Sequence, residues 1–399
     1  MVSHAPPVAM PVWPLLATLA VQTLATMSLY SLPTLAPEVA RDLHLNGTLV
    51  GGFVATAYGV GIVSALLSPG LIRRYGGVRA TQAVLLAAAG MLGIAAASFG
   101  VATMALGAVV LGSAYGAAAP ASTHLLVPHT PKSVFNMVMS LRQIGVPLGG
   151  VVAALILPSL VPLVGWRGAL LLELVPIVLL IAGMEIPRRA WDAGRDPRVR
   201  PWGRTLLQPF ALLRDRRILQ LSAGTFVYSG LSLSFVSFMT VHLTSVVGFD
   251  LIRAGQLLAV YQIAGSISRP IWGWIADRFL TPMRTLALHG AGMSVAAVLS
   301  GQFAASWSGP EIFAVVLLAG CTAGGYTGVA YAEYASLGGA RRTEATGLGT
   351  ALLFAGGLLI PPLFGASVAL SGGYETIYRA MAALALVSAM LLWVTPARA

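Results

Sequence analysis

The chain has 399 residues, of which 57% are hydrophobic and only 9% are charged, and its formal net charge is +11. Soluble domains carry about 25% charged residues, so this composition excludes an ordinary soluble protein and indicates an integral membrane protein. The single cysteine, Cys321, excludes a disulfide framework and a cysteine-rich metal site.

Apolar runs of about 18–25 residues can cross a bilayer as helices. The chain contains twelve such runs, which predict an all-α membrane protein with twelve transmembrane helices. We expect the first run to be a retained helix rather than a signal peptide, because it lacks a small-residue cleavage site. The predicted spans are approximately 12–33, 47–68, 79–98, 102–125, 136–160, 168–186, 217–242, 252–275, 285–304, 310–332, 345–370 and 376–396.

Basic residues predict the orientation of these spans. An even number of spans puts both termini on one side, and 18 of the 24 basic residues fall in the loops and tails of that side. The positive-inside rule therefore predicts that both termini are cytoplasmic, and we expect the bacterial inner membrane as the location. Because the bilayer accounts for the positive charge, no nucleic-acid partner is expected. The opposite loops hold only Arg41, Arg167, Arg253 and Arg379.

The longest polar stretch divides the chain into two halves of six spans. We predict an N-terminal half at 1–186, a basic cytoplasmic linker at 187–216 and a C-terminal half at 217–399. A shift of 204 residues aligns glycines at 51 and 61 with glycines at 255 and 265, and it also aligns Arg74 with Arg278. Parallel repeats of six spans are the layout of one large class of transporters.

The loops after the second and eighth spans carry the residues of a family motif. Gly273-Trp-Ile-Ala-Asp277-Arg278 resembles the glycine and Asp-Arg signature of the major facilitator superfamily, whereas the first copy has Arg73 in place of the acid and keeps Arg74. In that family the motif forms a cytoplasmic charge clamp, so the resemblance implies a gating role for Arg74, Asp277 and Arg278. The alternative is that these residues are ordinary positive-inside anchors.

Two arginines, Arg142 and Arg269, fall inside predicted spans. Arg269 lies eight residues before Asp277, which is about 12 Å deeper along a helix, and an arginine at the centre of a membrane costs about 2.5–3.5 kcal/mol or more. The spans contain few acids to pair with them. We expect both guanidinium groups to face one central cavity. A transported anion there would balance their charge, because guanidinium pairs with carboxylate bidentately.

Structural roles remain open for both arginines. Arg269 could donate hydrogen bonds to helix carbonyls or to Glu333, holding the eighth span to the tenth. Arg142 could be interfacial if the fifth span begins later than predicted.

The stretch Arg269-Pro270-x-x-Gly273 is similar to the eighth span of monocarboxylate transporters and of the oxalate:formate antiporter. In those relatives the arginine binds the substrate carboxylate, and the resemblance extends that role to Arg269 alone. The predicted eleventh span lacks the lysine that the oxalate exchanger uses, which disfavours oxalate.

Other residues are candidates for substrate contact or proton transfer. The family resemblance implies that spans one, four, seven and ten line the cavity, and each candidate could equally be a packing residue. Proton coupling requires a titratable group. We expect Glu173, the candidate on the sixth span, to pair with Arg167. The substrate-binding candidates are Tyr30, Tyr115, Tyr228, Gln262 and Tyr326, and the proton-coupling candidates are His124, Glu173 and Glu333.

Several chemistries are not expected. The chain has no Walker A loop, no group of residues with metal-ligand spacing and no soluble domain that could hold a catalytic triad. We therefore expect no cofactor, no metal and no enzymatic activity.

The expected function is proton-coupled uptake of a small organic anion, with a carboxylate favoured, by a monomeric secondary transporter that works by alternating access. The alternatives are a drug/proton antiporter of the same fold and a non-transporting sensor. The antiporter's Gly-Pro-x-x-Gly-Gly motif differs from Gly145-Val-Pro147-Leu-Gly149-Gly150.

Overall fold

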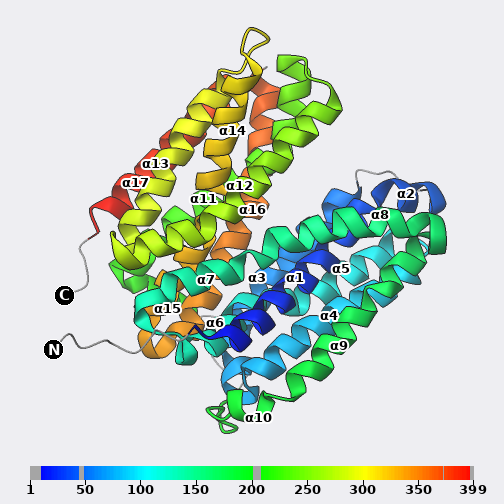
Figure 1. The fold of residues 1–399 in the computed structure, drawn as a ribbon, viewed down its shortest axis with the longest axis vertical. Coiled ribbons are helices and arrows are strands. Elements are labelled where there is room, and N and C mark those ends of the chain that lie inside the picture. The colour runs from blue at the N-terminus through cyan, green and yellow to red at the C-terminus, as the bar shows by residue number, and fades with distance from the viewer. Residues whose placement is uncertain (1–9, 45–48, 201–207, 372, 396–399) are drawn as a thin grey trace, which may run out of the picture.

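The computed structural model describes residues 10–44, 49–200, 208–371 and 373–395, and within these ranges the chain is helical nearly throughout and contains no strand (Figure 1). Eight helical segments of this part are long and apolar enough to cross a membrane. The predicted all-helical membrane fold is therefore confirmed. The expected positions of the chain ends fall on residues 1–9 and 396–399, which lie outside the described residues.

The first helices form an N-terminal bundle (α1–α9) around a core of small and apolar side chains (Figure 1). Leu29, Leu85 and Leu111 are fully buried in this core, whereas large apolar residues such as Leu155 and Leu163 remain exposed, as expected for a surface that contacts lipid. The helices are α1 (Val12–Thr34), α2 (Ala36–Asp42), α3 (Leu49–Tyr75), α4 (Gly77–Ala96), α5 (Val101–Tyr115), α6 (Ala118–Leu126), α7 (Phe135–Gln143), α8 (Gly145–Leu172) and α9 (Leu174–Glu185).

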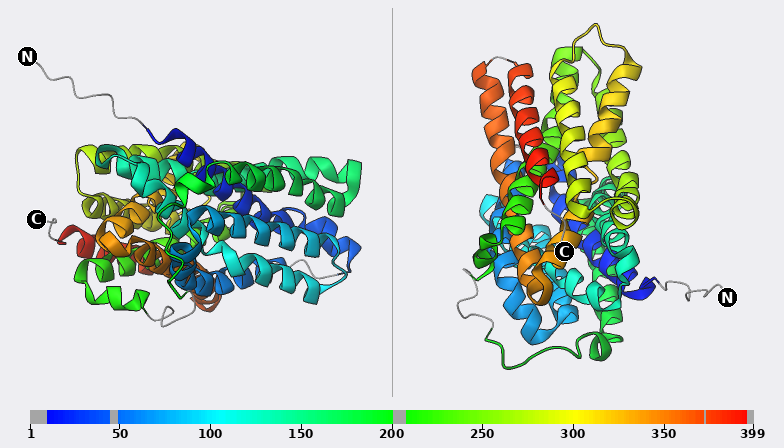
Figure 2. Two further views of the ribbon diagram at one scale, coloured as in Figure 1. Left: turned by 90° about the horizontal axis from the view of Figure 1, so that it is seen from below. Right: turned by 90° about the vertical axis from the view of Figure 1, so that its left-hand side faces the viewer.

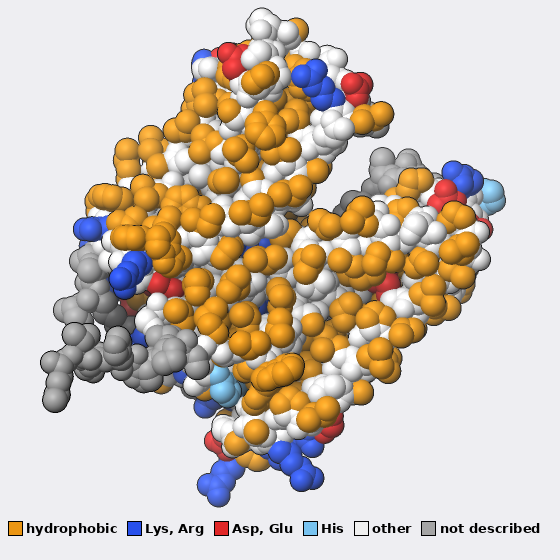
Figure 3. Space-filling view, in the orientation of Figure 1, with side chains coloured by type: hydrophobic (Ala, Val, Ile, Leu, Met, Phe, Trp, Pro, Cys, Tyr) orange, Lys and Arg blue, Asp and Glu red, His pale blue; other side chains and the backbone are white. Residues whose placement is uncertain are grey.

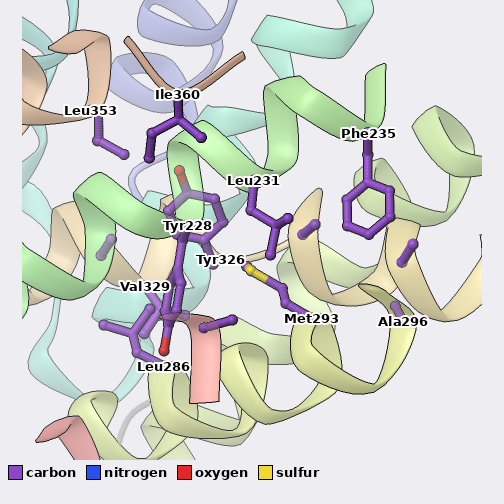
Figure 4. Packing of buried hydrophobic residues seen from close by; sticks show 14 of the residues in the cluster. Tyr228, Leu231, Phe235, Leu286, Met293, Ala296, Tyr326, Val329, Leu353 and Ile360 are labelled. Atoms are coloured by element: carbon purple, nitrogen blue, oxygen red, sulfur yellow. The ribbon is translucent and has the colours of Figure 1, made fainter. Parts of the chain in front are cut away.

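A second core organises the C-terminal bundle (α11–α17), which follows a short helix in the polar stretch, α10 (Arg188–Trp191). Figure 4 shows part of this core, in which Tyr228, Met293 and Ile360 come from different helices. The helices are α11 (Arg216–His242), α12 (Leu251–Arg278), α13 (Pro282–Gly301), α14 (Gly309–Ala323), α15 (Thr327–Gly338), α16 (Arg342–Ser371) and α17 (Glu375–Trp393).

Three of the predicted spans are broken near their middle. The span expected at 102–125 is interrupted between α5 and α6, the span at 310–332 between α14 and α15, and the span at 136–160 between α7 and α8. Glycine-rich sequence at the first two breaks lowers helix propensity. At the third, Pro147 has no backbone N–H, so the carbonyl of Gln143, four residues earlier, has no partner within the helix.

Gly165 separates the fifth and sixth predicted spans. It has φ +71° inside the otherwise helical α8, a backbone conformation that residues with a Cβ rarely adopt. The chain reverses there, so the predicted boundary at 161–167 corresponds to a turn.

Among the described residues, the backbones of the two bundles approach each other most closely at one end. We call this the basic end, because it carries Arg73, Lys132 and Arg278; the other end, with Arg41 and Arg253, is the opposite end. A Cβ at Gly328 would lie 2.3 Å from Ser140 Cα, so the backbones of α15 and α7 touch. The helices of the two bundles diverge from this contact (Figure 1, with two further views in Figure 2), and the space-filling view of Figure 3 shows a hollow between the bundles at the opposite end.

Candidate functional site: a cavity with a single charge

A cavity of about 180 Å³ lies between the two bundles, and both contribute its walls. Pockets for drug-sized ligands measure about 300–1,000 Å³, so this cavity suits a smaller solute. Its described lining residues include one charged side chain, Arg269, and no aspartate, glutamate, lysine or histidine. The cavity is therefore electropositive and has no acid of its own.

Arg269 is held in the wall by backbone carbonyls from both bundles. Its Nε donates to the carbonyl oxygen of Gly324 at 2.9 Å, and its Nη1 donates to the carbonyl oxygen of Gln143 at 2.6 Å. Both carbonyls belong to helix breaks, where chain geometry leaves them free to accept. Among the described residues no protein group binds Nη2. Carbonyl dipoles solvate the guanidinium but leave its unit charge uncompensated.

Arg142 is also buried, but it lies behind the cavity wall and does not line it. Its Nη2 donates to Gln22 Oε1 at 2.7 Å, to the Ala118 carbonyl at 3.1 Å and to Ser122 Oγ at 3.1 Å. Its Nη1 donates to Gln143 Oε1. The alternative in which Arg142 is interfacial is wrong, because the side chain has no exposed surface.

The two arginines meet on one residue. Arg142 binds the side-chain oxygen of Gln143, while Arg269 binds its backbone oxygen from the other bundle. Gln22 and Gln143 both line the cavity. Arg142 therefore orients two amide groups of the wall, one of which, Gln22, also donates from Nε2 to Thr26 Oγ1 at 3.0 Å. Arg269 is the arginine that reaches the cavity itself.

Replacing Arg142 with alanine is expected to destabilise the protein. Gln22 and Gln143 would each keep a buried side-chain oxygen without its donor, at about 1–3 kcal/mol per group, whereas the Ala118 carbonyl would still accept from Ser122 Oγ. We expect the thermal midpoint in detergent to fall by roughly 5–10 °C. Arg379→Ala is the control, because that arginine forms an exposed i,i+4 pair with Glu375. Equal midpoints for Arg142→Ala and wild type would contradict this role.

Aromatic rings form much of the remaining wall. Tyr58 and Phe354 stack with centroids 4.8 Å apart, and Tyr115 stacks on Phe354 at 5.8 Å, so this group joins α3, α5 and α16 across the two bundles. Hydroxyl partners fix several of the phenols in place. The pairs are Tyr115 with Thr26 at 3.2 Å, Tyr261 with Ser232 at 3.1 Å, and Tyr331 with Thr350 at 3.2 Å.

Four of the five predicted tyrosine and glutamine candidates line the cavity: Tyr30, Tyr115, Gln262 and Tyr326. Tyr228 does not. Figure 4 shows its ring in the core of the C-terminal bundle, beside Tyr326 at a centroid distance of 5.7 Å. A Cβ built on Gly290 would lie 2.0 Å from its hydroxyl, so Tyr228 points toward α13 and away from the cavity.

Sequence reasoning missed several lining residues, most of which lie outside the four spans that the family resemblance implied. Tyr261 and Gln143 were adjacent in sequence to the candidates Gln262 and Arg142, which was a usable signal. No comparable signal marked the residues on α3 and α16. The missed lining residues include Tyr58, Gln143, Tyr261, Tyr331, Thr350 and Phe354.

None of the three proton-coupling candidates lines the cavity. His124 Nδ1 lies 3.5 Å from Thr343 Oγ1 of the other bundle. Glu333 is buried in α15, beside the contact with α7. Glu173 is buried at the junction of α8 and α9, where Ser31 of α1 is its hydrogen-bond partner.

The expected pairing of Glu173 with Arg167 is wrong. Arg167 instead binds Asp42 and donates to the Ser98 carbonyl at 3.0 Å, at the surface of the opposite end. The hydrogen bond from Arg167 lowers the pKa of Asp42. After the turn at Gly165, Arg167 lies at the surface while Glu173 enters the bundle, so the five residues between them separate the two side chains.

The gating candidates lie at the basic end. Asp277 accepts from the backbone N–H groups of Asn136 and Met137 at 3.0 and 2.9 Å, so it caps α7 of the other bundle. Arg278 is exposed, and Arg74 donates to the carbonyl of Val199 at 3.0 Å.

The first copy of the motif has its charges exchanged. Arg73 occupies the place of the acid, and Glu344 of α16 faces it from the other bundle at 3.3 Å. A second acid comes from the polar stretch, where Asp192 accepts from the N–H of Val78 at 2.9 Å and burial raises its pKa. Gly76, with φ +99°, is needed there because a Cβ would lie 2.1 Å from Asp192 Cγ.

Comparisons with known proteins agree with this architecture. A family model described as Major Facilitator Superfamily matches residues 18–361. The chain is 24% identical to a 4-hydroxybenzoate transporter, PcaK, of Acinetobacter baylyi over 326 residues, which is 71% of this chain and 68% of that protein. It is 31% identical to human monocarboxylate transporter 11 over 219 residues, which is 50% of this chain and 44% of that protein.

A solved structure also shares the fold. The human organic anion transporter MFSD10 superposes with a TM-score of 0.76 at 16% identity, covering 96% of this chain and all of that one (100%).

Proposed function

This chain belongs to the major facilitator superfamily, whose members are transporters and not enzymes, and from that premise we propose that it carries a small organic carboxylate across a membrane by alternating access. The observation that supports this proposal most is the position of Arg269. It is the only charged residue among the described residues of the cavity lining, and its charge is uncompensated. An anion in the cavity would supply the missing charge at Nη2.

The substrate is a small acid with an apolar or aromatic body. The wall supplies six tyrosines and Phe354, whose faces and edges give favourable contacts to planar groups. The relative in Acinetobacter is named as a transporter of 4-hydroxybenzoate, a molecule with one carboxylate, one ring and one hydroxyl. Tyr30, Tyr115, Gln262 and Tyr326 contact this substrate, while Arg142 acts on it through Gln22 and Gln143.

Twelve spans make up the transporting unit. The eight apolar segments include two that hold two spans each, at 132–185 and 309–368, and α12 and α13 complete the set. We take residues 1–186 and 217–399 as the two moving halves and 187–216 as their linker. The unit is a monomer in the bacterial inner membrane, with the basic end and both termini in the cytoplasm.

The contact at the basic end is the closed gate. Asp277 of the C-terminal half caps α7 of the N-terminal half, and Arg73 of the N-terminal half pairs with Glu344 of the C-terminal half. Arg74 and Arg278 flank this contact at the membrane surface. The cavity in this conformation faces the opposite end, which corresponds to the periplasm in the proposed orientation. The proposed mode of transport is uptake by proton symport, in which one buried acid carries the proton.

Transport in liposomes tests the proposal. Purified protein is reconstituted, and uptake of radiolabelled benzoate, 4-hydroxybenzoate, lactate and oxalate is measured with and without an inward proton gradient. Saturable uptake of an aromatic acid, absent from empty liposomes, is the expected result. Proton-driven exchange of a cationic dye, with no carboxylate uptake, would favour the drug antiporter instead, and no flux of any solute would favour the sensor.

A further inference from the structure

Glu173 is a buried acid that does not line the cavity, so substrate binding does not explain its presence. It ends α8 and begins α9, and only 3% of its surface is exposed. Its Oε2 is fully buried and has no hydrogen-bond partner among the described residues. An ionised carboxylate at such a position would carry a large desolvation cost.

No ion pair with Glu173 is found in the part of the chain that the structure describes. The helices packed against its segment are α1, α4, α7 and α10. α1 has no charged residue, and Tyr30 is its only titratable group. The basic residues of the other helices, and of α8 and α9, bind other partners or lie at the basic end. Arg79 and Arg188 pair with Glu185, and Arg167 pairs with Asp42. Arg142 binds amide and carbonyl oxygens, and Arg189 lies in α10 at the basic end.

The neighbouring hydroxyl shows where a proton fits. Ser31 Oγ lies 2.8 Å from the Met27 carbonyl oxygen and 2.5 Å from Glu173 Oε1. A hydroxyl has one hydrogen, and both of these neighbours can only accept if Glu173 is ionised. If Glu173 is protonated, its O–H donates to Ser31 while Ser31 donates to Met27, and both short contacts become hydrogen bonds.

We propose that Glu173 binds the proton that is co-transported with the carboxylate, and that it holds this proton in the conformation described here. This inference rests on the proposed function. Ser31 follows Tyr30, which lines the cavity, and the same helix carries Gln22, which binds Arg142. Loss of the proton reverses the Ser31 hydroxyl and weakens the contact of α1 with α8 and α9. The protonation state of Glu173 thereby reaches the substrate wall through one continuous helix.

Infrared spectroscopy detects the proton without any substrate. At neutral pH, the spectrum of purified wild-type protein minus that of Glu173→Gln is expected to show the C=O stretch of a buried carboxylic acid. The subtraction removes any band from other buried acids such as Asp192 and Glu333, which both proteins share. Glu185→Gln, on the same helix but half-exposed, is the matched control and retains the band. If the wild type lacks the band, or if Glu173→Gln keeps it, the assignment of the proton to Glu173 is overturned.

Transport measurements then test the coupling. The glutamine amide donates to Ser31 as a protonated acid does, so Glu173→Gln mimics the loaded state and is expected to fold. It should exchange labelled for unlabelled carboxylate like the wild type while losing gradient-driven accumulation by about tenfold. Accumulation at the wild-type level in this variant would overturn the coupling role. Absence of carboxylate exchange in the wild type would overturn the proposed function, whereas the infrared band judges proton binding separately.

Discussion

Arg269→Gln is expected to lower the affinity for the transported carboxylate by about 100-fold, because a hydrogen bond to a charged group is worth about 1.5–3 kcal/mol and each 1.4 kcal/mol is tenfold in affinity. The glutamine amide can still donate to the carbonyls of Gly324 or Gln143, so the wall keeps a donor while the cavity loses its charge. Titration of intrinsic tryptophan fluorescence with the carboxylate, in detergent, measures the change.

Arg269→Lys should be intermediate. It retains the charge, but a lysine ammonium lacks the planar fork of guanidinium and cannot hold two carbonyls and a carboxylate in the same geometry. Uptake in liposomes should be almost lost in Arg269→Gln and partly retained in Arg269→Lys.

The matched control removes another arginine from the same helix. Arg253 is exposed near the start of α12, with its guanidinium 4.0 Å from the centroid of the Phe249 ring, and it lies outside the cavity lining. Arg253→Ala should bind the carboxylate like the wild type. Wild-type affinity in a folded Arg269→Gln variant would remove the basis for anion recognition in this cavity.

Gly328→Leu is expected to prevent closure of the basic end. Even a Cβ would lie 2.3 Å from Ser140 Cα and Oγ, so a leucine must push α15 away from α7. Overpacking of this kind costs about 1–3 kcal/mol, and the cost applies only to the conformation in which the two helices touch. The equilibrium should therefore shift by about ten- to 100-fold toward the conformation that is open at the basic end.

Distances between spin labels report this shift. Labels at Ser133 and Arg341, one on each bundle at the basic end, should move apart in Gly328→Leu, and labels at Ala97 and Ser306 should approach each other at the opposite end. The native Cys321 is replaced by serine in all these samples. Carboxylate uptake should fall together with the population of the closed basic end.

Gly183→Leu is the control for glycine replacement in a helix. A Cβ at Gly183 would meet no atom within 4 Å, so the added side chain enters open space on α9. This variant should keep wild-type distances and uptake. If Gly328→Leu folds and leaves both label distances unchanged, the contact between α15 and α7 is not the gate.

Hydropathy and the few charges in the apolar runs predicted the helical spans and one residue of the cavity wall. Each predicted span corresponds to one or more helices, because bilayer-length apolar runs form helices whatever their neighbours are. The rarity of acids in the spans singled out Arg269, and the structure places it in the cavity wall. The sequence resemblance to the major facilitator superfamily is confirmed by the family match.

Side-chain partners were harder to foresee. Arg142 and Arg269 were expected to face the cavity together, yet Arg142 lies behind it, because α7 ends at Gln143 and turns the side chain toward α1 and α6. The break released the Gln143 carbonyl, and a helix pattern read as one continuous span cannot show such an acceptor. The expected pair of Glu173 and Arg167 does not form for a similar reason. The chain turns at Gly165, which leaves Arg167 at the surface of the N-terminal bundle and Glu173 in its interior.

Local sums of hydropathy and charge along the chain were enough to establish a helical membrane protein and to mark one costly arginine, because bilayer insertion acts on each segment separately. The cavity, its aromatic walls and the gate contacts depended on the assembled bundles. Arg269 binds a carbonyl 126 positions away, and Arg73 pairs with an acid 271 positions away. Such distances close only when the helices pack, so packing geometry rather than local composition determines these partners.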